Sequence, residues 1–380
     1  MDVWTAVDGE GGGPVQPREL VVGTRPSPLA LWQARWVMEQ LEAAARRHAL
    51  PLRMTLREIR TEGDLDRETP LARFGQRGVF VRAVEQALRR GEVDVAVHSL
   101  KDLPGEQPPD LVLAAYPIRD DARDVAVVNR PGGGPDTPDP GRSPAAGAVA
   151  RPLPFLPPGA RVGTGSPRRI AHLRHWRPDL VFVPIRGNVD TRLRKLESGG
   201  LDAIVLAAAG LRRLGLWDDR VQPLAPEHCL PAPGQGALAV QVRAADNQAR
   251  AVVSLIDDPH VRVAVTAERE LLARLGGGCH VPIGALAVWE GDGAERRLHL
   301  QASVADPEGT RLIVAGFHRP APALLQKPDP PLGPGEERTA AGAWEEAVVA
   351  AEAAARELAR AVAERLLAQG AGELLARRTP

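Results

Sequence analysis

An internal duplication constrains the fold of this chain more than any other feature. Residues 22–28 (VGTRPSP) resemble residues 162–167 (VGTGSP), and each copy continues into a helical pattern. In both copies a serine can cap the helix and a proline can occupy its first position. A second match follows in each half, where a glycine and an Asp-led strand recur at 91–97 and at 200–205. We therefore predict an α/β fold with two similar lobes that face a cleft.

The cleft of such a fold suits anions. Ligands of α/β folds lie at the carboxyl ends of the strands, where helix N-termini present bare N–H groups and a positive dipole. The chain is predicted to cross between the lobes at about 116–123 and again at 231–236, so that the strand at 237–242 returns to the first lobe. The predicted arrangement is periplasmic-binding-protein-like.

A third unit, predicted to be α+β, begins at about Asp258. It comprises a helix, a glycine-rich loop with Cys279, three strand-like stretches and a long Ala-rich helix from about Trp344 to Gln369. The predicted division of the chain is a disordered tail (1–17), domain 1 (18–117 plus 237–256), domain 2 (118–236) and domain 3 (257–380). Two Gly/Pro-rich stretches, 130–158 and 319–335, are predicted to be flexible insertions, and the polar segment 60–78 a mobile lid.

Composition argues against several classes of protein. The chain has 48 Lys+Arg and 48 Asp+Glu, so it has no overall basic field for nucleic acid or an anionic membrane. Residues 1–17 lack the pattern of an export signal, and no run approaches the roughly 20 apolar residues of a membrane helix. The two cysteines, Cys229 and Cys279, do not suggest a disulfide framework, and without CxxC or HExxH we expect no metal site. The expected compartment is the cytoplasm.

Arginines at predicted strand ends and helix starts indicate a site for anions. They are Arg25 in the first turn, Arg168 and Arg169 at a helix start, Arg186 at a strand end and Arg192 one turn into the next helix. Arginine binds carboxylates bidentately and stays charged at any relevant pH. Any one of them could be an ordinary solvated charge, but their grouping favours a clamp. Because neither a GxGxxG nor a Walker-type loop is present, a small polycarboxylate is a better candidate than a nucleotide.

Two further positions carry reactive or charged groups in unusual settings. Cys279 follows three glycines in 275–284 (LGGGCHVPIG), where the bare backbone could present the thiol to a ligand. The alternative is that this cysteine is a small buried hydrophobe. Lys101, one of three lysines in the chain, stands beside Asp102 in 97–104 (VHSLKDLP), at the end of an apolar strand. An ammonium next to a carboxylate at a strand end indicates a functional site.

Taken together, these motifs resemble those of the porphobilinogen deaminase family, whose members are also called hydroxymethylbilane synthases. The matching strings are 24–33 (TRPSPLALWQ), 98–102 (HSLKD), 186–192 (RGNVDTR), 206–211 (LAAAGL), 233–237 (PGQGA) and 277–279 (GGC). They occur in the order of the family, and the resemblance extends from about Leu20 to the C-terminal helices.

The resemblance implies a concrete activity. A dipyrromethane cofactor, made of two substrate units, is bound by a thioether to Cys279 and primes the head-to-tail condensation of four porphobilinogen molecules. Ammonia leaves at each step, and hydrolysis then frees hydroxymethylbilane for tetrapyrrole (haem) biosynthesis. The resemblance also implies a monomer and makes Asp102 the catalytic carboxyl group. The cofactor-binding residues that it implies are Cys279, Lys101, Asp102, Ser166, Arg168, Arg169, Arg192 and Gly210, and the substrate-binding residues are Arg25, Ser27, Arg186, Arg213 and Gln235.

Some positions depart from the family pattern, and two other readings remain open. Gly165 replaces a serine, Arg77 stands where lysine is common, and the insertion at 130–158 is longer than expected. Two lobes around an anion site also describe a solute-binding protein, although that class is exported. A cysteine hydrolase would need a base near Cys279, and the adjacent His280 is the candidate.

Overall fold

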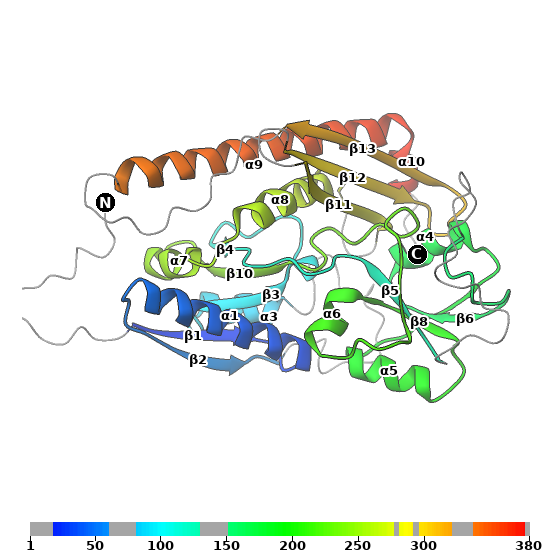
Figure 1. Cartoon of the computed structure of the whole chain (residues 1–380), viewed down its shortest axis with the longest axis horizontal. Helices are drawn as coiled ribbons and strands as arrows, with labels where there is room; N and C mark the ends of the chain where they lie inside the picture. The colour runs from blue at the N-terminus through cyan, green and yellow to red at the C-terminus, as the bar shows by residue number, and fades with distance from the viewer. Residues whose placement is uncertain are drawn as a thin grey trace, which may run out of the picture.

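The computed structural model describes residues 18–60, 81–129, 151–276, 281–291, 296–320 and 337–376, with side chains in the last range from Glu345 onward. The predicted tail, nearly all of the predicted lid and Cys279 lie outside these ranges. Figure 1 shows three units, with two lobes side by side and a third unit that lies along both of them. The predicted α/β class with two lobes and a C-terminal α+β unit is confirmed.

The first lobe is built on a five-stranded sheet in the order β2-β1-β3-β10-β4. Strands β1 and β2, and β1 and β3, pair in parallel, whereas β10 runs antiparallel to both β3 and β4. Its strands are β1 (Arg18–Thr24), β2 (Leu52–Glu58), β3 (Val95–Ser99), β4 (Leu111–Ala115) and β10 (Leu238–Arg243), and its helices are α1 (Pro28–Arg47), α3 (Arg82–Arg89) and α7 (Asn247–Ser254).

The second lobe repeats this plan with the order β7-β6-β8-β5-β9. Here β6 pairs in parallel with β7 and β8, and β5 runs antiparallel to β8 and β9. Its strands are β5 (Asp124–Val128), β6 (Arg161–Gly163), β7 (Val181–Val183), β8 (Ala203–Ala207) and β9 (Val221–Pro223), and its helices are α4 (Pro167–Trp176), α5 (Val189–Glu197) and α6 (Ala208–Arg213). The matching strand orders show that the sequence duplication is a duplication of fold.

The chain passes between the two sheets twice, from β4 to β5 and from β9 to β10. The two passes pair with each other, because the Asp120 N–H donates to the Gly236 carbonyl at 3.0 Å and Arg119 forms a bridge with Ala237. Gly236 has φ +86°, and a Cβ there would collide with the Asp120 carbonyl. Glycine at this position therefore permits the close approach of the two passes. The domain limits drawn from the sequence stay a prediction.

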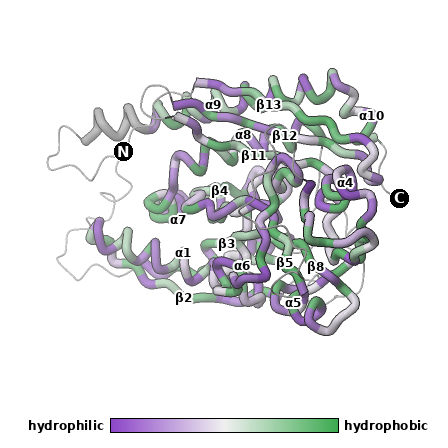
Figure 2. The backbone as a smooth tube through the Cα atoms, turned by 45° about the vertical axis from the view of Figure 1, so that its right-hand side comes forward, coloured by the Kyte–Doolittle hydropathy of each residue, from purple (hydrophilic) through white to green (hydrophobic). Residues whose placement is uncertain are grey.

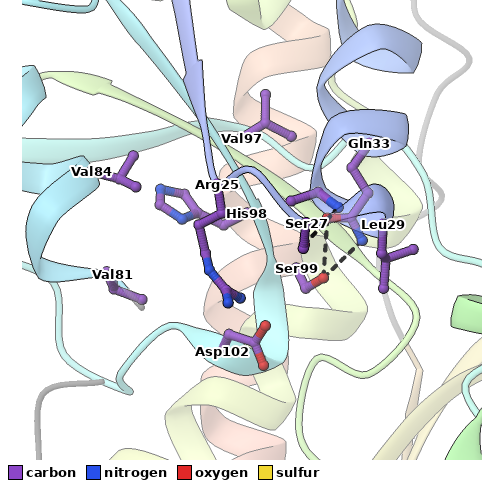
Figure 3. Close-up of a pocket in the computed structure, with 11 residues that line it drawn as sticks. Arg25, Ser27, Leu29, Gln33, Val81, Val84, Val97, His98, Ser99 and Asp102 are labelled. Carbon is purple, nitrogen blue, oxygen red and sulfur yellow. Dashed lines mark hydrogen bonds between the residues drawn. The ribbon is translucent and has the colours of Figure 1, made fainter. Parts of the chain in front are cut away.

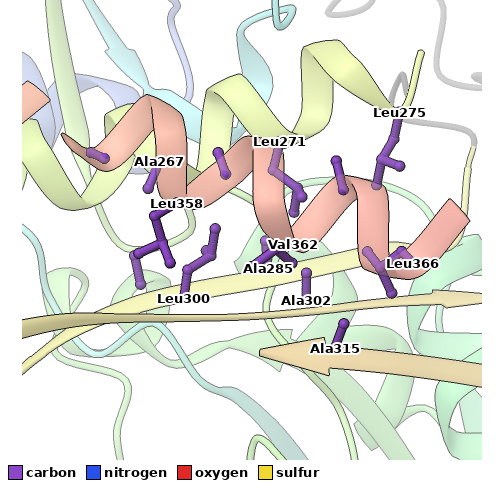
Figure 4. Packing of buried hydrophobic residues seen from close by; sticks show 14 of the residues in the cluster. Ala267, Leu271, Leu275, Ala285, Leu300, Ala302, Ala315, Leu358, Val362 and Leu366 are labelled. Carbon is purple, nitrogen blue, oxygen red and sulfur yellow. The ribbon is translucent and has the colours of Figure 1, made fainter. Parts of the chain in front are cut away.

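The third unit packs helices on one face of an antiparallel sheet, β11-β12-β13. Figure 4 shows leucine, valine and alanine side chains of α8 and α9 meeting those of the strands, and Figure 2 shows the alternation of hydrophilic and hydrophobic residues along α9. Its elements are α8 (Pro259–Arg274), β11 (Ile283–Glu290), β12 (Arg297–Ala305), β13 (Leu312–Pro320), α9 (Glu337–Ala368) and α10 (Ala371–Ala376). The long helix thus begins earlier than the predicted Trp344. Among the described residues, no helix combines the length and apolarity needed to cross a membrane.

Three local predictions are wrong. Residues 151–158 do not form part of a flexible insertion, because Leu153 and Leu156 lie in the core of the second lobe and Arg177 donates to the carbonyls of both. The second predicted insertion starts too early, since residues 319 and 320 belong to β13. Arg186 does not end a strand: β7 ends at Val183, so Arg186 lies in the loop before α5.

Candidate functional site

A pocket lies in the first lobe where β1 and β3 end and α1 begins (Figure 3). Its walls combine apolar side chains with charged and hydrogen-bonding groups, a mixture typical of ligand sites. The lining residues are Arg25, Ser27, Leu29, Ala30, Gln33, Val81, Val84, Val97, His98, Ser99 and Asp102.

Asp102 reaches this pocket from a short 3₁₀ turn, Leu100–Asp102, that follows β3. The turn is anchored to the neighbouring strand by the Leu100 N–H, which donates to the Ala237 carbonyl at 3.0 Å. On the other side, Arg269 of α8 donates to the carbonyls of residues 104 and 105 at 2.8 Å each. The third unit therefore helps to hold the loop that carries Asp102.

The opposite wall of the pocket is the turn between β1 and α1. Ser27 caps α1, its hydroxyl accepting a hydrogen bond from the Ala30 N–H at 3.3 Å, as the sequence predicted. Figure 3 shows the guanidinium of Arg25 pointing toward the carboxylate of Asp102. Burial lowers the pKa of the nearby His98 to about 4, so its imidazole is neutral at pH 7. The pocket thus holds one cation, one carboxylate and one neutral imidazole.

The second lobe concentrates charge at the equivalent place. Arg168 and Arg169, at the start of α4, are 5% and 6% exposed, and both bind the fully buried Asp124 at the start of β5. Arg168 Nη1 lies 2.6 Å from Asp124 Oδ2, and Arg169 Nη2 lies 2.7 Å from Asp124 Oδ1. Burial alone would raise the pKa of Asp124, but the two arginines lower it well below its usual range. Two guanidiniums and one carboxylate leave this cluster with a net positive charge.

Gln235 connects the two lobes through this cluster. Its side chain is 1% exposed in the crossing between β9 and β10, and its amide nitrogen donates to Asp124 Oδ1 at 2.9 Å. Its amide oxygen accepts a hydrogen bond from Lys101 Nζ at 3.3 Å. Lys101 is the neighbour of Asp102, so a continuous chain of contacts runs from the 3₁₀ turn of the first lobe to the arginine cluster of the second.

The cationic side chains around this chain of contacts repel one another. Burial, followed by the positive charge of Arg169, lowers the pKa of Lys101 to about 8. Burial together with Arg169 and Arg186 lowers the pKa of Arg192 to about 10, although Asp102 acts in the opposite direction. Because each cation disfavours the charge of the next, bound carboxylates would relieve the repulsion. The structure thus places Lys101, Arg169 and Arg192 close enough to one another for their charges to interact, and Asp102 acts on Lys101 and Arg192.

Other predicted site residues have structural partners. Arg213 Nε pairs with Asp120 Oδ2 at 2.6 Å, and its Nη2 donates to the Gly236 carbonyl at 2.6 Å, so this side chain braces the crossing between the lobes. Gly210 lies in α6, where a Cβ would sit 3.7 Å from a methyl group of Leu29 in the first lobe. Ser166 caps α4 by accepting from the Arg169 N–H at 3.5 Å.

Of the two cysteines, only Cys229 lies among the described residues. Cys279 and His280 lie outside the described residues. Cys229 is fully buried, its thiol 3.4 Å from both Asp124 and Arg168, and burial raises its pKa to about 12. A thiol with so high a pKa is a poor nucleophile.

Sequence reasoning missed two carboxylates and one arginine that organise the site. Asp124 anchors the arginine cluster, and Arg269 holds the Asp102 loop. Glu268, also on α8, is fully buried and binds Arg119 of the first crossing at 2.7 Å and the Gly234 N–H of the second at 2.6 Å. Asp124 left one signal in the sequence: it is a carboxylate at the head of an apolar strand. The other two show no local signal, since their partners are distant in sequence.

Two family profiles and the relatives described here carry the name porphobilinogen deaminase. Residues 20–251 match the family profile "Porphobilinogen deaminase, dipyromethane cofactor binding domain", and residues 263–319 match "Porphobilinogen deaminase, C-terminal domain". Porphobilinogen deaminase of Roseiflexus castenholzii (strain DSM 13941 / HLO8) is 48% identical over 273 residues, which are 72% of this chain and 82% of that protein. Porphobilinogen deaminase of Desulforudis audaxviator (strain MP104C) is 42% identical over 360 residues, or 95% of this chain and 98% of that protein.

Among solved structures, a distant likeness is found to the second substrate binding domain of a putative amino acid ABC transporter from Streptococcus pneumoniae Canada MDR_19A. It covers 63% of this chain and 91% of that one, with 12% identity and a TM-score of 0.36, which is too weak to carry functional information. The two profile matches, by contrast, span both lobes and the part of the third unit from α8 to β13. The chain belongs to the porphobilinogen deaminase family.

Proposed function

We propose that this protein condenses porphobilinogen into hydroxymethylbilane on a dipyrromethane primer, with Asp102 as the catalytic carboxyl group. The enzyme is a transferase of tetrapyrrole synthesis, as its family membership establishes. The observation that best supports the residue assignment is the group of mutually repelling cations beside Asp102. Burying cations close together costs free energy, and binding a neutral ligand would not offset that cost.

The residues present fit a cofactor that carries several carboxylates. Lys101 and Arg192 have pKa values lowered by burial and by neighbouring cations, so anionic groups placed among them would restore favourable charge pairing. Arg168 and Arg169 add positive charge from a cluster that Asp124 only half neutralises. We assign Lys101, Ser166, Arg168, Arg169 and Arg192 to hold the cofactor, which is attached at Cys279. When bound, the dipyrromethane supplies the primer for polymerisation.

Asp102 acts on porphobilinogen in this proposal. The bond between the aminomethyl carbon and its nitrogen breaks, ammonia leaves, and positive charge develops on the pyrrole. A carboxyl group beside the pyrrole N–H can assist the departure of ammonia and then stabilise that charge. The loop of Asp102 is held by a backbone hydrogen bond at Leu100 and by the Arg269 guanidinium at Pro104, so the carboxylate needs little rearrangement.

Substrate binding falls to the pocket and the loops that face it. Arg25 projects toward Asp102 and can pair with an acetate or propionate group while the carboxylate meets the ring. We assign Ser27 and Arg186 to the same task. For Arg213 and Gln235 we propose a positioning role instead of direct contact, because both side chains brace the crossing between the lobes. We expect the enzyme to act as a monomer in the cytoplasm.

The test is the intact mass of the purified protein, followed by peptide mapping. We expect an excess of two linked pyrrole units on the peptide that contains Cys279. In Cys279→Ser the excess should be absent, because a hydroxyl is a far poorer nucleophile than a thiol. Cys229→Ser is the matched control and should keep the full excess. Normal loading of Cys279→Ser would place the attachment elsewhere.

Incubation with porphobilinogen distinguishes the proposed enzyme from a solute-binding protein and from a cysteine hydrolase. The proposed enzyme releases ammonia stoichiometrically with porphobilinogen consumed, whereas a solute-binding protein would bind the compound and return it unchanged. A cysteine hydrolase would lose its activity in His280→Ala but show no pyrrole adduct. Binding without ammonia release would overturn the proposed function.

A further inference from the structure

The third unit carries a cluster of potential metal ligands outside the site described above. Glu290, His299 and His318 come from β11, β12 and β13, one from each strand of the sheet. Their ligand atoms all lie within 4.8 Å of one another, and His299 stands directly opposite His318 in the strand register. Since the three residues sit on paired strands, their mutual placement is fixed by the sheet.

We propose that Glu290, His299 and His318 form a binding site for a divalent transition metal ion, with Zn²⁺ as the ion that suits it best. Two imidazoles and one carboxylate are a donor set that zinc prefers. In a tetrahedral site with ligands about 2.0–2.1 Å from zinc, neighbouring ligand atoms lie about 3.3 Å apart. The Nδ1 atoms of His299 and His318 each lie 3.2 Å from a different oxygen of Glu290.

Both histidines offer the atom that a metal needs. The two rings are stacked with centroids 4.1 Å apart and an interplanar angle of 15°, and both present Nδ1 to the same carboxylate. Small rotations of the two rings would turn both lone pairs toward one ion, and water would complete the coordination.

A neighbouring arginine holds the carboxylate when no metal is bound. Arg297 Nε lies 3.2 Å from Glu290 Oε2, and the Arg297 side chain is 53% exposed. An exposed ion pair of this kind contributes little to stability, so a metal ion can displace the guanidinium into water at small cost. The same contact keeps Glu290 near the two histidines in the metal-free protein.

The consequence of binding would be structural. An ion held by one residue from each strand would cross-link the whole sheet, including β13 at its edge. No sequence motif indicates this site, because its ligands are brought together only by strand pairing.

The experiment uses untagged protein with its cofactor in place, treated with a chelator and then dialysed. Zn²⁺ is titrated in competition with a chromophoric chelator, and the melting temperature is recorded with and without one equivalent of Zn²⁺. We expect one equivalent to bind with micromolar or tighter affinity and the melting temperature to rise. Glu290→Gln and His318→Asn should each weaken binding by about tenfold or more. His48→Asn, which removes an exposed histidine of the first lobe, should leave it unchanged.

Two outcomes would overturn the proposal: no saturable Zn²⁺ binding by the chelator-treated protein, or unchanged affinity in His318→Asn. Because His318 is the most exposed of the three residues, its variant should fold normally, which circular dichroism checks. Production of hydroxymethylbilane does not enter either readout, so failure of the metal site would leave the proposed function untouched.

Discussion

The two lobes open with the same strand, turn and serine-capped helix, yet they offer different surfaces to a ligand. In the first lobe the turn contributes Arg25 to a pocket that also contains Asp102. In the second lobe the equivalent place holds Arg168 and Arg169, which are both buried and both paired with Asp124. One lobe presents a carboxyl group in a pocket, and the other provides a fixed source of positive charge.

The difference arises from the residues next to the two caps. After Ser27 and its proline, α1 continues with Leu29 and an alanine, which leaves the helix start apolar. After Ser166 and its proline, α4 continues at once with two arginines. A helix N-terminus repels cations, and Asp124 compensates for this by lying against both arginines. The two copies of the scaffold therefore differ in charge at two helical positions, and the turn after β3 adds Asp102 to the first lobe.

The largest effect is expected for the reactive side of this comparison. Asp102→Ala should lower kcat by about 10²–10⁴-fold, the usual range for the loss of a general acid–base group. Cofactor loading should persist, because the cations of the second lobe remain. Steady-state turnover and the intact mass, measured on one sample, check both points. Turnover close to that of the parent protein would remove Asp102 from the catalytic role.

The second lobe should respond through stability instead. Asp124→Asn leaves two buried guanidiniums without their carboxylate, which we expect to cost about 3–5 kcal/mol of unfolding free energy. Urea denaturation of the variant measures this loss. Asp121→Asn is the matched control: its partner Arg123 is 42% exposed, so the cost there should be within about 1 kcal/mol. Equal losses in both variants would show that the cluster is not special.

The arginine pair also predicts an acid limit for the stability of the second lobe. Because the folded-state pKa of Asp124 is lowered, its contribution is present above the unfolded pKa of about 3.9 and is lost as pH falls further. The parent protein should therefore lose stability in acid more steeply than Asp124→Asn.

Lys101 connects the two lobes and should introduce a pH dependence. With a pKa of about 8, it is roughly nine-tenths protonated at pH 7 and roughly one-tenth at pH 9. Cofactor loading of cofactor-free protein should therefore slow by about tenfold between these values as a charged hydrogen-bond donor is lost. Lys101→Arg keeps its charge and should show a flatter profile. A parallel decline in that variant would assign the titration to another group.

The smallest effect should come from the two caps that the lobes share. Ser27→Ala and Ser166→Ala each remove one hydroxyl acceptor, and each should cost about 1 kcal/mol in denaturation experiments. Because Ser27 lines the pocket whereas Ser166 starts the arginine helix, only the first should also raise the KM for porphobilinogen. Identical kinetic changes in both variants would contradict the proposal that the two lobes have different roles.

Local pattern was enough to predict the lobes, the serine caps and the third unit. Each depends on residues close in sequence, such as the Ser-Pro pairs at 27 and 166. The contacts that organise the site are of another kind. Glu268 meets Arg119, and Gln235 meets Asp124, across more than a hundred positions of chain. No sequence periodicity reveals pairs so far apart. The sequence therefore indicates which residues have suitable chemistry for the site, but it does not show that Arg168, Arg169 and Arg213 have acidic partners.

The pairing of the two crossings limits how the lobes can move. Two separate linkers would leave the lobes able to bend, twist and slide, but these passes are bonded to each other at Asp120 and Gly236 and are held together by Glu268 from a third direction. Rotation about the long axis of the connection would break those bonds, whereas bending of both passes together would keep them. Any relative motion of the lobes that preserves these bonds must therefore bend both passes together, and a lengthening polypyrrole can gain room without breaking them only in that way.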